Sequence, residues 1–222
     1  MRELARDVHQ LRGWPPNAIN VYVIGDVLID AATRRAERRI MRQIAGRPVA
    51  AHALTHAHPD HQGSSHAICG RLGIPLWCGR GDVPAMETPG GVAGVNPPTW
   101  ATFVQRRFWV GPEHPVARAL VEGDEVAGFT VLETPGHSAG HVAYWRESDR
   151  VLIAGDVLTN MNLTTGLPGL HEPLAAFTPD PARNRASARR LAELRPRLTC
   201  FGHGPPLSDP GRLADFAARL AQ

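Results

Sequence analysis

The stretch Thr55-His56-Ala57-His58-Pro59-Asp60-His61 follows an apolar run and places three imidazoles and one carboxylate within six residues. His56 and His58 stand two positions apart, so in an extended segment their side chains project to the same side. Neutral imidazoles and carboxylates are the ligands that borderline divalent metals bind. The stretch therefore predicts a metal site directly after a buried strand.

Three further candidate ligands stand at wide spacing, each at or near the end of a hydrophobic stretch. They are His137 in Thr-Pro-Gly-His, Asp156 in Ala-Gly-Asp and His203 in Phe-Gly-His-Gly. Together with the first cluster they make seven candidate ligands. Seven are too many for one ion, whereas two ions that share one ligand would use them all.

The composition argues against several classes of partner. The chain has 222 residues, enough for one large domain or two small ones. All of its basic side chains are Arg, and the net charge of +3 gives little reason to expect a nucleic-acid partner. Cys69, Cys78 and Cys200 are odd in number and lack CxxC spacing, so we expect no disulfide framework.

We also expect neither a membrane span nor a secretory leader. No apolar run reaches the roughly 18 residues that a transmembrane helix needs, and the N-terminal Met-Arg-Glu-Leu-Ala-Arg-Asp lacks an apolar core. A cytoplasmic protein is therefore expected. The sequence does not determine the oligomeric state.

Apolar patterning and turn residues predict alternating strands and helices. Two strands are expected in 18–30 around the Gly25-Asp26 turn, and further strands over 49–55, 74–78, 129–133, 141–145, 151–154 and 198–201. Helices are expected over 33–45 with Thr33 as N-cap, over 64–72 with Gly73 at the end, and over 182–194 and 211–221. Arginines on the first helix are interpreted as a solvated face: Arg34, Arg35, Arg38, Arg39 and Arg42.

Two stretches, 84–115 and 160–181, are rich in Pro and Gly and are not expected to form regular structure. Long irregular segments in compact domains are often binding loops. The apolar residues in these stretches either pack in the core or form opposite walls of a substrate cleft. The first stretch offers Trp100, Phe103, Phe108 and Trp109, and the second Leu163, Leu167, Leu170 and His171.

The ordered set of motifs resembles the metallo-β-lactamase superfamily, in which His-x-His-x-Asp-His is followed by separate His, Asp and His ligands. The resemblance extends from Asn20 to Gly204, nearly the whole chain. It implies an α/β (α+β) fold in which two mixed β-sheets are flanked by helices as an αββα sandwich. It also implies a single domain over 1–222, with the ligands on loops along one edge.

The same resemblance implies a role for each ligand and a dinuclear cofactor. The implied metals are two divalent ions, Zn²⁺ first, with Fe or Mn as alternatives. A hydroxide between them would attack a carbonyl or phosphoryl centre, and Asp60 would act as the catalytic residue that orients it and passes on its proton. One ion would be held by His56, His58 and His137, the other by Asp60, His61 and His203, and both by Asp156.

Within the superfamily, the Thr134-Pro-Gly-His and Ala154-Gly-Asp blocks look most like the glyoxalase II group of thioester hydrolases. Two departures separate the chain from that group. Only a short helix follows His203, so the helical domain that holds glutathione is not expected, and Asp60-His61 continues as Gln62-Gly63-Ser64. The resemblance therefore implies a small-molecule carbonyl substrate, thioester first and ester or lactone second.

Other branches fit the motifs less well. The bridging Asp156 argues against a β-lactam substrate, and His58 stands where flavo-diiron proteins carry Glu. Quorum-quenching lactonases share all seven ligands, but many place a Tyr where Val157-Leu158-Thr159 stands here. No basic, Gly-rich insertion suggests the RNA-binding arm of RNase Z-type nucleases. A mononuclear iron persulfide dioxygenase is the main alternative, and a lactonase is the second.

The remaining histidines are assigned other places. His141 is expected behind the metal ligands, where it would orient the His137 loop. His171 is left as a candidate for contact with substrate. The others are expected to have no functional role: His9, His52, His66 and His114.

Overall fold

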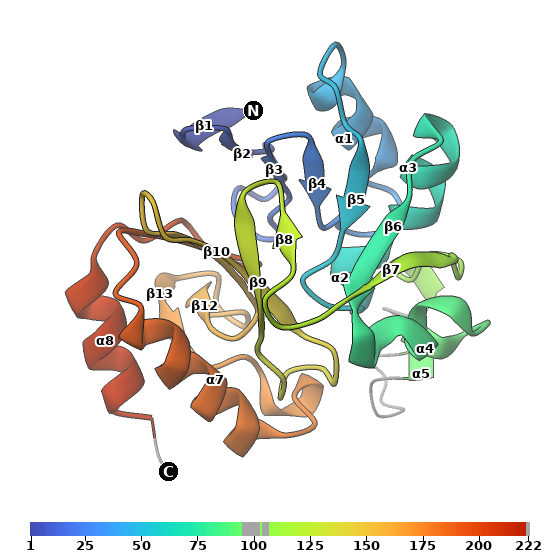
Figure 1. Cartoon of the computed structure of the whole chain (residues 1–222). Coiled ribbons are helices and arrows are strands. Elements are labelled where there is room, and N and C mark those ends of the chain that lie inside the picture. Colours follow the sequence, from blue (N-terminus) through green and yellow to red (C-terminus); the bar gives the residue numbers. More distant parts are fainter. Residues whose placement is uncertain (95–102, 104–106, 221–222) are drawn as a thin grey trace.

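The computed structural model describes residues 1–94, 103 and 107–220. Among these residues, two large sheets account for most strands (Figure 1). The first has the order β1 Arg2–Ala5, β2 Val8–Gln10, β3 Tyr22–Ile24, β4 Val27–Ile29, β5 Ala51–Ala53, β6 Leu76–Gly79 and β7 Val116–Leu120. The second has the order β14 Leu198–Phe201, β11 Val151–Gly155, β10 Val142–Arg146, β9 Phe129–Glu133 and β8 Glu125–Val126.

Both sheets are mixed. In the first, β1 to β4 are antiparallel neighbours, and β4 to β7 are parallel neighbours. The β3–β4 hairpin turns at Gly25 and Asp26, as the sequence predicts, and Gly25 has a positive φ of 54° that favours glycine. In the second sheet β14 is parallel to β11, and the other neighbours are antiparallel.

Alternation along the strands places apolar side chains on both faces of each sheet. In β3, Tyr22 and Ile24 enter the core between the sheets, whereas the flanking Val21 and Val23 lie in the core on the other face. Phe129 belongs to the core between the sheets and Leu132 to the outer core of the second sheet. A strand buried on both faces needs a cover on its outer side as well.

Helices provide that cover and complete an αββα sandwich (Figure 1). α1 and α3 pack on the outer face of the first sheet, and α7 and α8 pack on the outer face of the second. The described helices are α1 Glu37–Ile44, α2 Pro59–Gln62, α3 Ser65–Leu72, α4 Val83–Glu87, α5 Gly91–Gly94, α7 Pro181–Glu193 and α8 Pro210–Ala218, with the short 3-10 turns η1 Arg80–Asp82 and η2 Ala175–Phe177. No described helix combines the length and apolarity needed to cross a bilayer.

Most elements lie where the patterning predicts them, with three differences. Thr33 does not cap α1, because that helix begins at Glu37 after Ala36 without a side-chain cap. The predicted irregular stretches contain helical turns α4 and α5, and a hairpin of β12 Thr159–Met161 and β13 Pro168–His171. The strands β1, β2, β7 and β8 were not predicted, because their short or half-exposed segments carry weak apolar alternation.

Candidate metal centre

Four loops at one edge of the sandwich carry the candidate ligands. The His56–His61 segment follows β5 directly, and His137 follows β9. Asp156 follows β11, and His203 follows β14. Because β9 and β14 both run parallel to β11, the loops after these three strands leave the second sheet at the same edge. The topology thus brings together residues that are up to 147 positions apart, from His56 to His203.

The first group of ligand atoms consists of three buried imidazoles, from His56, His58 and His137. Hydroxyl groups fix two of these rings. The His56 Nδ1 lies 3.0 Å from Thr55 Oγ1, and the His137 Nδ1 lies 3.0 Å from Thr178 Oγ1. Since the Thr178 hydroxyl donates to the carbonyl oxygen of Leu174, it accepts from His137 Nδ1–H. That leaves the lone pair on His137 Nε2, which is the state a metal ligand needs.

The second group consists of Asp60, His61 and His203. The His61 Nδ1 donates to Asp30 Oδ2 at 2.9 Å, and the His203 Nδ1 donates to the carbonyl oxygen of Ala18. In both rings Nε2 is therefore the nitrogen directed at the site. The His203 Nε2 lies 3.3 Å from Asp60 Oδ2.

Asp156 lies between the two groups. Its Oδ2 is 3.6 Å from His137 Nε2 in the first group, and 3.5 Å and 3.0 Å from the Nε2 atoms of His61 and His203 in the second. Its backbone N–H donates to His141 Nε2 at 3.0 Å. A side chain at Gly202 would collide with Asp156 Oδ1, so a glycine is required for this close approach.

His141 lies behind the candidate ligands and contacts the His137 loop, as expected, and it also contacts the Asp156 loop. Its Nδ1 lies 2.8 Å from Thr134 Oγ1, and its Nε2 accepts from the Asp156 backbone. It therefore links the loop before His137 to the Asp156 loop. Burial lowers the pKa of His141 to about 3, which keeps the ring neutral and able to accept this hydrogen bond.

Two carboxylates that the sequence analysis did not single out hold the loops in place. Asp30 accepts from the backbone N–H and the hydroxyl of Thr55, as well as from His61. Asp82 accepts from the backbone N–H groups of Ala57 and Gly140, and from the hydroxyl of Ser138. Both lie beyond the motif positions, so only the tertiary contacts reveal them.

The two groups differ in how the protein sets their protonation. Burial lowers the pKa of the imidazoles of His56, His58 and His137, which favours neutral rings. Burial also opposes charge on His203, but Asp156 and Asp60 outweigh it and raise its pKa to about 10. The pKa of His61 is raised likewise, because Asp156 and Asp30 outweigh its burial.

The donor set fits divalent cations. Five buried atoms of the candidate ligands have no hydrogen-bond partner among the described residues: Nε2 of His56, His58, His61 and His137, and Oδ1 of Asp156. An unsatisfied buried polar group costs about 1–3 kcal/mol, so five would cost an amount comparable with the whole stability of a typical domain, about 5–15 kcal/mol. Coordination of cations would satisfy all five.

A cleft of about 570 Å³ opens above these ligands. His58, Asp60, His137, Asp156 and His203 lie in its floor. Its walls are mostly apolar and come from the loop before β3, from the segment after the undescribed residues 104–106, and from the loops around β12 and η2. The main apolar wall residues are Trp14, Pro15, Ile19, Trp109, Met161, Leu163, Leu174 and Phe177.

The predicted cleft walls are therefore only partly correct. Trp109 and Leu163 line the cleft, and Trp100 lies outside the described residues. The side chains of Phe103 and Leu167 are each 66% exposed and do not line the cleft, and neither does Phe108. Leu170 is buried in the outer core. His171 lines a separate hollow with Glu172 and Phe216, so it does not face the metal centre.

Known proteins share this arrangement of sequence and fold. The chain is 28% identical to the probable metallo-hydrolase YflN of Bacillus subtilis, over 99% of this chain and 93% of that protein. It is 32% identical to a hydroxyacylglutathione hydrolase of Rhodospirillum rubrum, but over only 47% of this chain and 32% of that protein. The crystal structure of TTHA1623 in a di-iron-bound form superposes with a TM-score of 0.71 at 29% identity, covering 96% of this chain and 98% of that one.

The family profile described as "Metallo-beta-lactamase superfamily" matches residues 14–203. This match spans the four ligand-bearing loops and most of both sheets. A superfamily that binds divalent metals accounts for the His and Asp clusters at the sandwich edge. The chain belongs to the metallo-β-lactamase superfamily and is a metallo-hydrolase of that superfamily.

Proposed function

We propose that the chain is a dinuclear hydrolase that cleaves a small carbonyl substrate, with thioesters first and esters or lactones second. The observation that carries this proposal is the convergence of all seven candidate ligands beneath an apolar cleft, with Asp156 between two groups of three. We assign one ion, Zn²⁺ first, to each group. The partial match to hydroxyacylglutathione hydrolases supports a thioester as the first choice.

The protein groups divide the work between binding and proton transfer. When bound, divalent cations supply Lewis acidity and lower the pKa of a coordinated water toward about 7. His61 and His203 outweigh the effect of burial on Asp60 and hold its pKa below the usual range, so near neutral pH it is a carboxylate that can accept a hydrogen bond from a water. Asp60 reaches the cleft floor, where it can orient the attacking water.

The cleft walls support an apolar acyl group as the bound part of the substrate. Trp109 and Leu163 line the cleft, and Trp14 at 87% exposure offers further apolar surface beside it. Among the described residues, no arginine lines this cleft. A substrate carboxylate would therefore lack a guanidinium partner there, whereas an acyl chain would bury apolar area at about 25 cal/mol per Å².

Turnover without oxygen tests the reaction class. The protein, purified without added metal, is analysed for metal content and assayed with acyl thioesters under argon. We expect two metal ions per chain and thioester hydrolysis at the same rate with and without oxygen, because water is the only co-substrate. One iron per chain, with oxygen consumption on glutathione persulfide and no thioester cleavage, would instead identify a persulfide dioxygenase.

A chain-length series tests the cleft. Trp109→Ala should raise the KM for octanoyl thioesters much more than that for acetyl thioesters, because the lost contact grows with the buried chain. Leu167→Ala is the matched control, since Leu167 is exposed outside the cleft. If both variants change both KM values equally, Trp109 has no role in acyl recognition.

A further inference from the structure

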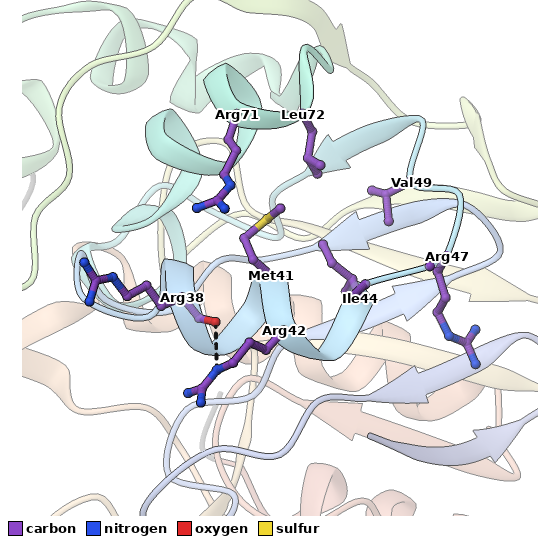
Figure 2. Close-up of a pocket in the computed structure, with 10 residues that line it drawn as sticks. Arg38, Met41, Arg42, Ile44, Arg47, Val49, Arg71 and Leu72 are labelled. Carbon is purple, nitrogen blue, oxygen red and sulfur yellow. Dashed lines mark hydrogen bonds between the residues drawn. The ribbon is translucent and has the colours of Figure 1, made fainter.

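A second hollow, of about 830 Å³, shares no lining residue with the cleft above the candidate ligands. It is formed by α1 from Arg38 onward, by the turn that follows, and by the end of α3 (Figure 2). We call this hollow the arginine groove.

The floor of the arginine groove is apolar. Figure 2 shows Met41, Ile44, Val49 and Leu72 gathered at its centre. Ile44 is buried, Met41 and Val49 are half-buried, and Leu72 is 37% exposed. The volume lies in the range of small-molecule sites, about 300–1,000 Å³.

The rim is strongly basic. Arg38, Arg42, Arg47 and Arg71 line the groove, and no carboxylate does. Among the described residues, the salt bridge between Arg71 and Glu37, at 3.0 Å, brings one carboxylate to these arginines. The Arg47 guanidinium lies 3.2 Å from His9 Nε2, and the Arg42 guanidinium donates to the backbone carbonyl oxygen of Arg38.

Helix ends and nearby carboxylates offset only part of the positive charge of the four arginines. Basic residues are favourable at helix carboxyl ends, and both α1 and α3 end at the groove. Each helix end is equivalent to about half a negative charge, so the two ends offset about one arginine. Glu37 offsets another. About two of the four positive charges are thus left over, and among the described residues Arg38, Arg42 and Arg47 form no salt bridge.

The apolar floor and the basic rim of the arginine groove together decide which kind of ligand fits it. Repulsion between like charges opposes a second copy of the same groove. Single-stranded nucleic acid would need aromatic rings for stacking, and no aromatic residue lines the groove. A bilayer surface is flat, whereas the apolar floor is recessed. A single acyl chain with an anionic head satisfies both the floor and the rim.

We propose that the arginine groove binds a free fatty-acid-like carboxylate, with its chain on Met41, Ile44 and Leu72 and its head between Arg38 and Arg42. The site is separate from the metal centre and does not depend on the function proposed for it. Its ligand belongs to the chemical class that thioester or ester hydrolysis would release, an acyl carboxylate.

Amide NMR shifts of the metal-loaded chain test the proposal. Three probes are titrated: octanoate, acetate as an anion without a chain, and octyl glucoside as a neutral amphiphile. We expect octanoate to shift the amides of Gly46 and Leu72 and to bind at least tenfold more tightly than either other probe. Equal binding of octyl glucoside, or shifts confined to the cleft around Trp109, would overturn the proposal.

Paired arginine variants locate the charge. Arg38→Gln/Arg42→Gln should weaken octanoate binding at the groove at least tenfold, and helix formation should persist because Arg and Gln have similar propensities. Arg183→Gln/Arg212→Gln removes the same charge from exposed positions on α7 and α8 and should leave the affinity unchanged. Equal affinities for all three proteins would overturn the proposal. The proposal would also be overturned if the protein bound anionic vesicles or an oligonucleotide and did not bind octanoate.

Discussion

The two groups of candidate ligands lie on either side of Asp156, but the protein holds them in different ways. In the group of His56, His58 and His137, neutral hydroxyls from Thr55 and Thr178 contact two of the rings. In the other group, a buried carboxylate, Asp30, holds His61. A hydrogen bond to a charged acceptor is roughly twice as strong as one between neutral groups.

This difference also sets which protons the groups carry. The first group has rings whose pKa burial lowers, so their lone pairs are free near neutral pH. In the second group the carboxylates raise the pKa of His61 and His203. A cation that enters the second group must displace protons, whereas one that enters the first does not. Similar types of ligand can therefore form half-sites whose metal binding depends on pH to different degrees.

Removal of the shared ligand should have the largest effect. Asp156→Ala takes away the carboxylate between the groups, so we expect metal content to fall toward one ion and kcat/KM to fall by at least about 10³-fold. The fold should survive, because the residue lies on an edge loop. Asp215→Ala, an exposed position on α8, is the control. Two retained metals with full turnover would rule out a bridging role.

Loss of the carboxylate behind His61 should affect the half-site of His61 more than the half-site of His56. Asp30→Asn keeps the size and tolerates the positive φ of 60°, but it cannot accept from His61 and Thr55 with both oxygens. Partners of this kind typically contribute 10–100-fold to metal affinity, and we expect the upper part of that range. Stepwise metal titration by calorimetry should show a larger loss of affinity at the site of His61, which Asp30 contacts directly, than at the site of His56, which it reaches only through Thr55. Equal weakening of both sites would contradict the distinction between the groups.

The sequence could single out the candidate ligands because each stands in a local motif at a strand end. The same reasoning predicted the strands that carry them, since β5, β11 and β14 are largely buried, and β9 buries three of its five side chains. Asp30 was not predicted as a partner of His61 because the two are 31 positions apart, and no local pattern connects them. Asp82 was missed for the same reason.

The cleft was the least predictable part of the site. Aromatic content in a Pro-rich stretch suggested its walls, but Phe103 points to solvent and only Trp109 lines the cleft among the described residues of that set. Trp14 and Phe177, which do line it, come from a loop before β3 and from η2. Trp14 lies outside the two stretches that were expected to form walls, and nothing singles out Phe177 within the second stretch, because the wall exists only once loops from distant positions meet.

A hydroxyl-to-methyl change should have a smaller effect on the first half-site. Thr178→Val keeps the shape but removes the acceptor for His137 Nδ1–H. Because a neutral hydrogen bond is the weaker kind, we expect a loss of about tenfold in the affinity of one site, less than for Asp30→Asn. The measurement is the same stepwise titration, and Thr164→Val, at an exposed position, is the control. A loss larger than that of Asp30→Asn would reverse the comparison.

A histidine outside both groups should affect stability and leave metal binding unchanged. His52 is buried in β5, where its Nδ1 donates to the carbonyl oxygen of Leu28 at 3.0 Å and its Nε2 lies 2.8 Å from Ser65 Oγ. Burial lowers its pKa from 6.5 to about 4. Between these pH values the unfolded chain binds a proton that the folded chain does not, so stability falls as the pH falls from 6.5 to 4.

The shift corresponds to about 3 kcal/mol across that pH window, at 1.36 kcal/mol per pKa unit. In His52→Asn, an amide replaces the ring as donor to Leu28 and does not titrate, so this part of the pH dependence should disappear whatever the absolute stability of the variant. Denaturant unfolding of both metal-loaded proteins between pH 4 and 7 gives the difference between their free energies of unfolding. Metal release at low pH affects both proteins alike, so it cancels from this difference. Parallel pH curves for the two proteins would show that His52 does not titrate differently on folding. If the free energy of unfolding of the wild type rises with pH relative to that of the variant, His52 does titrate differently. The metal content at pH 7 should be the same in both proteins.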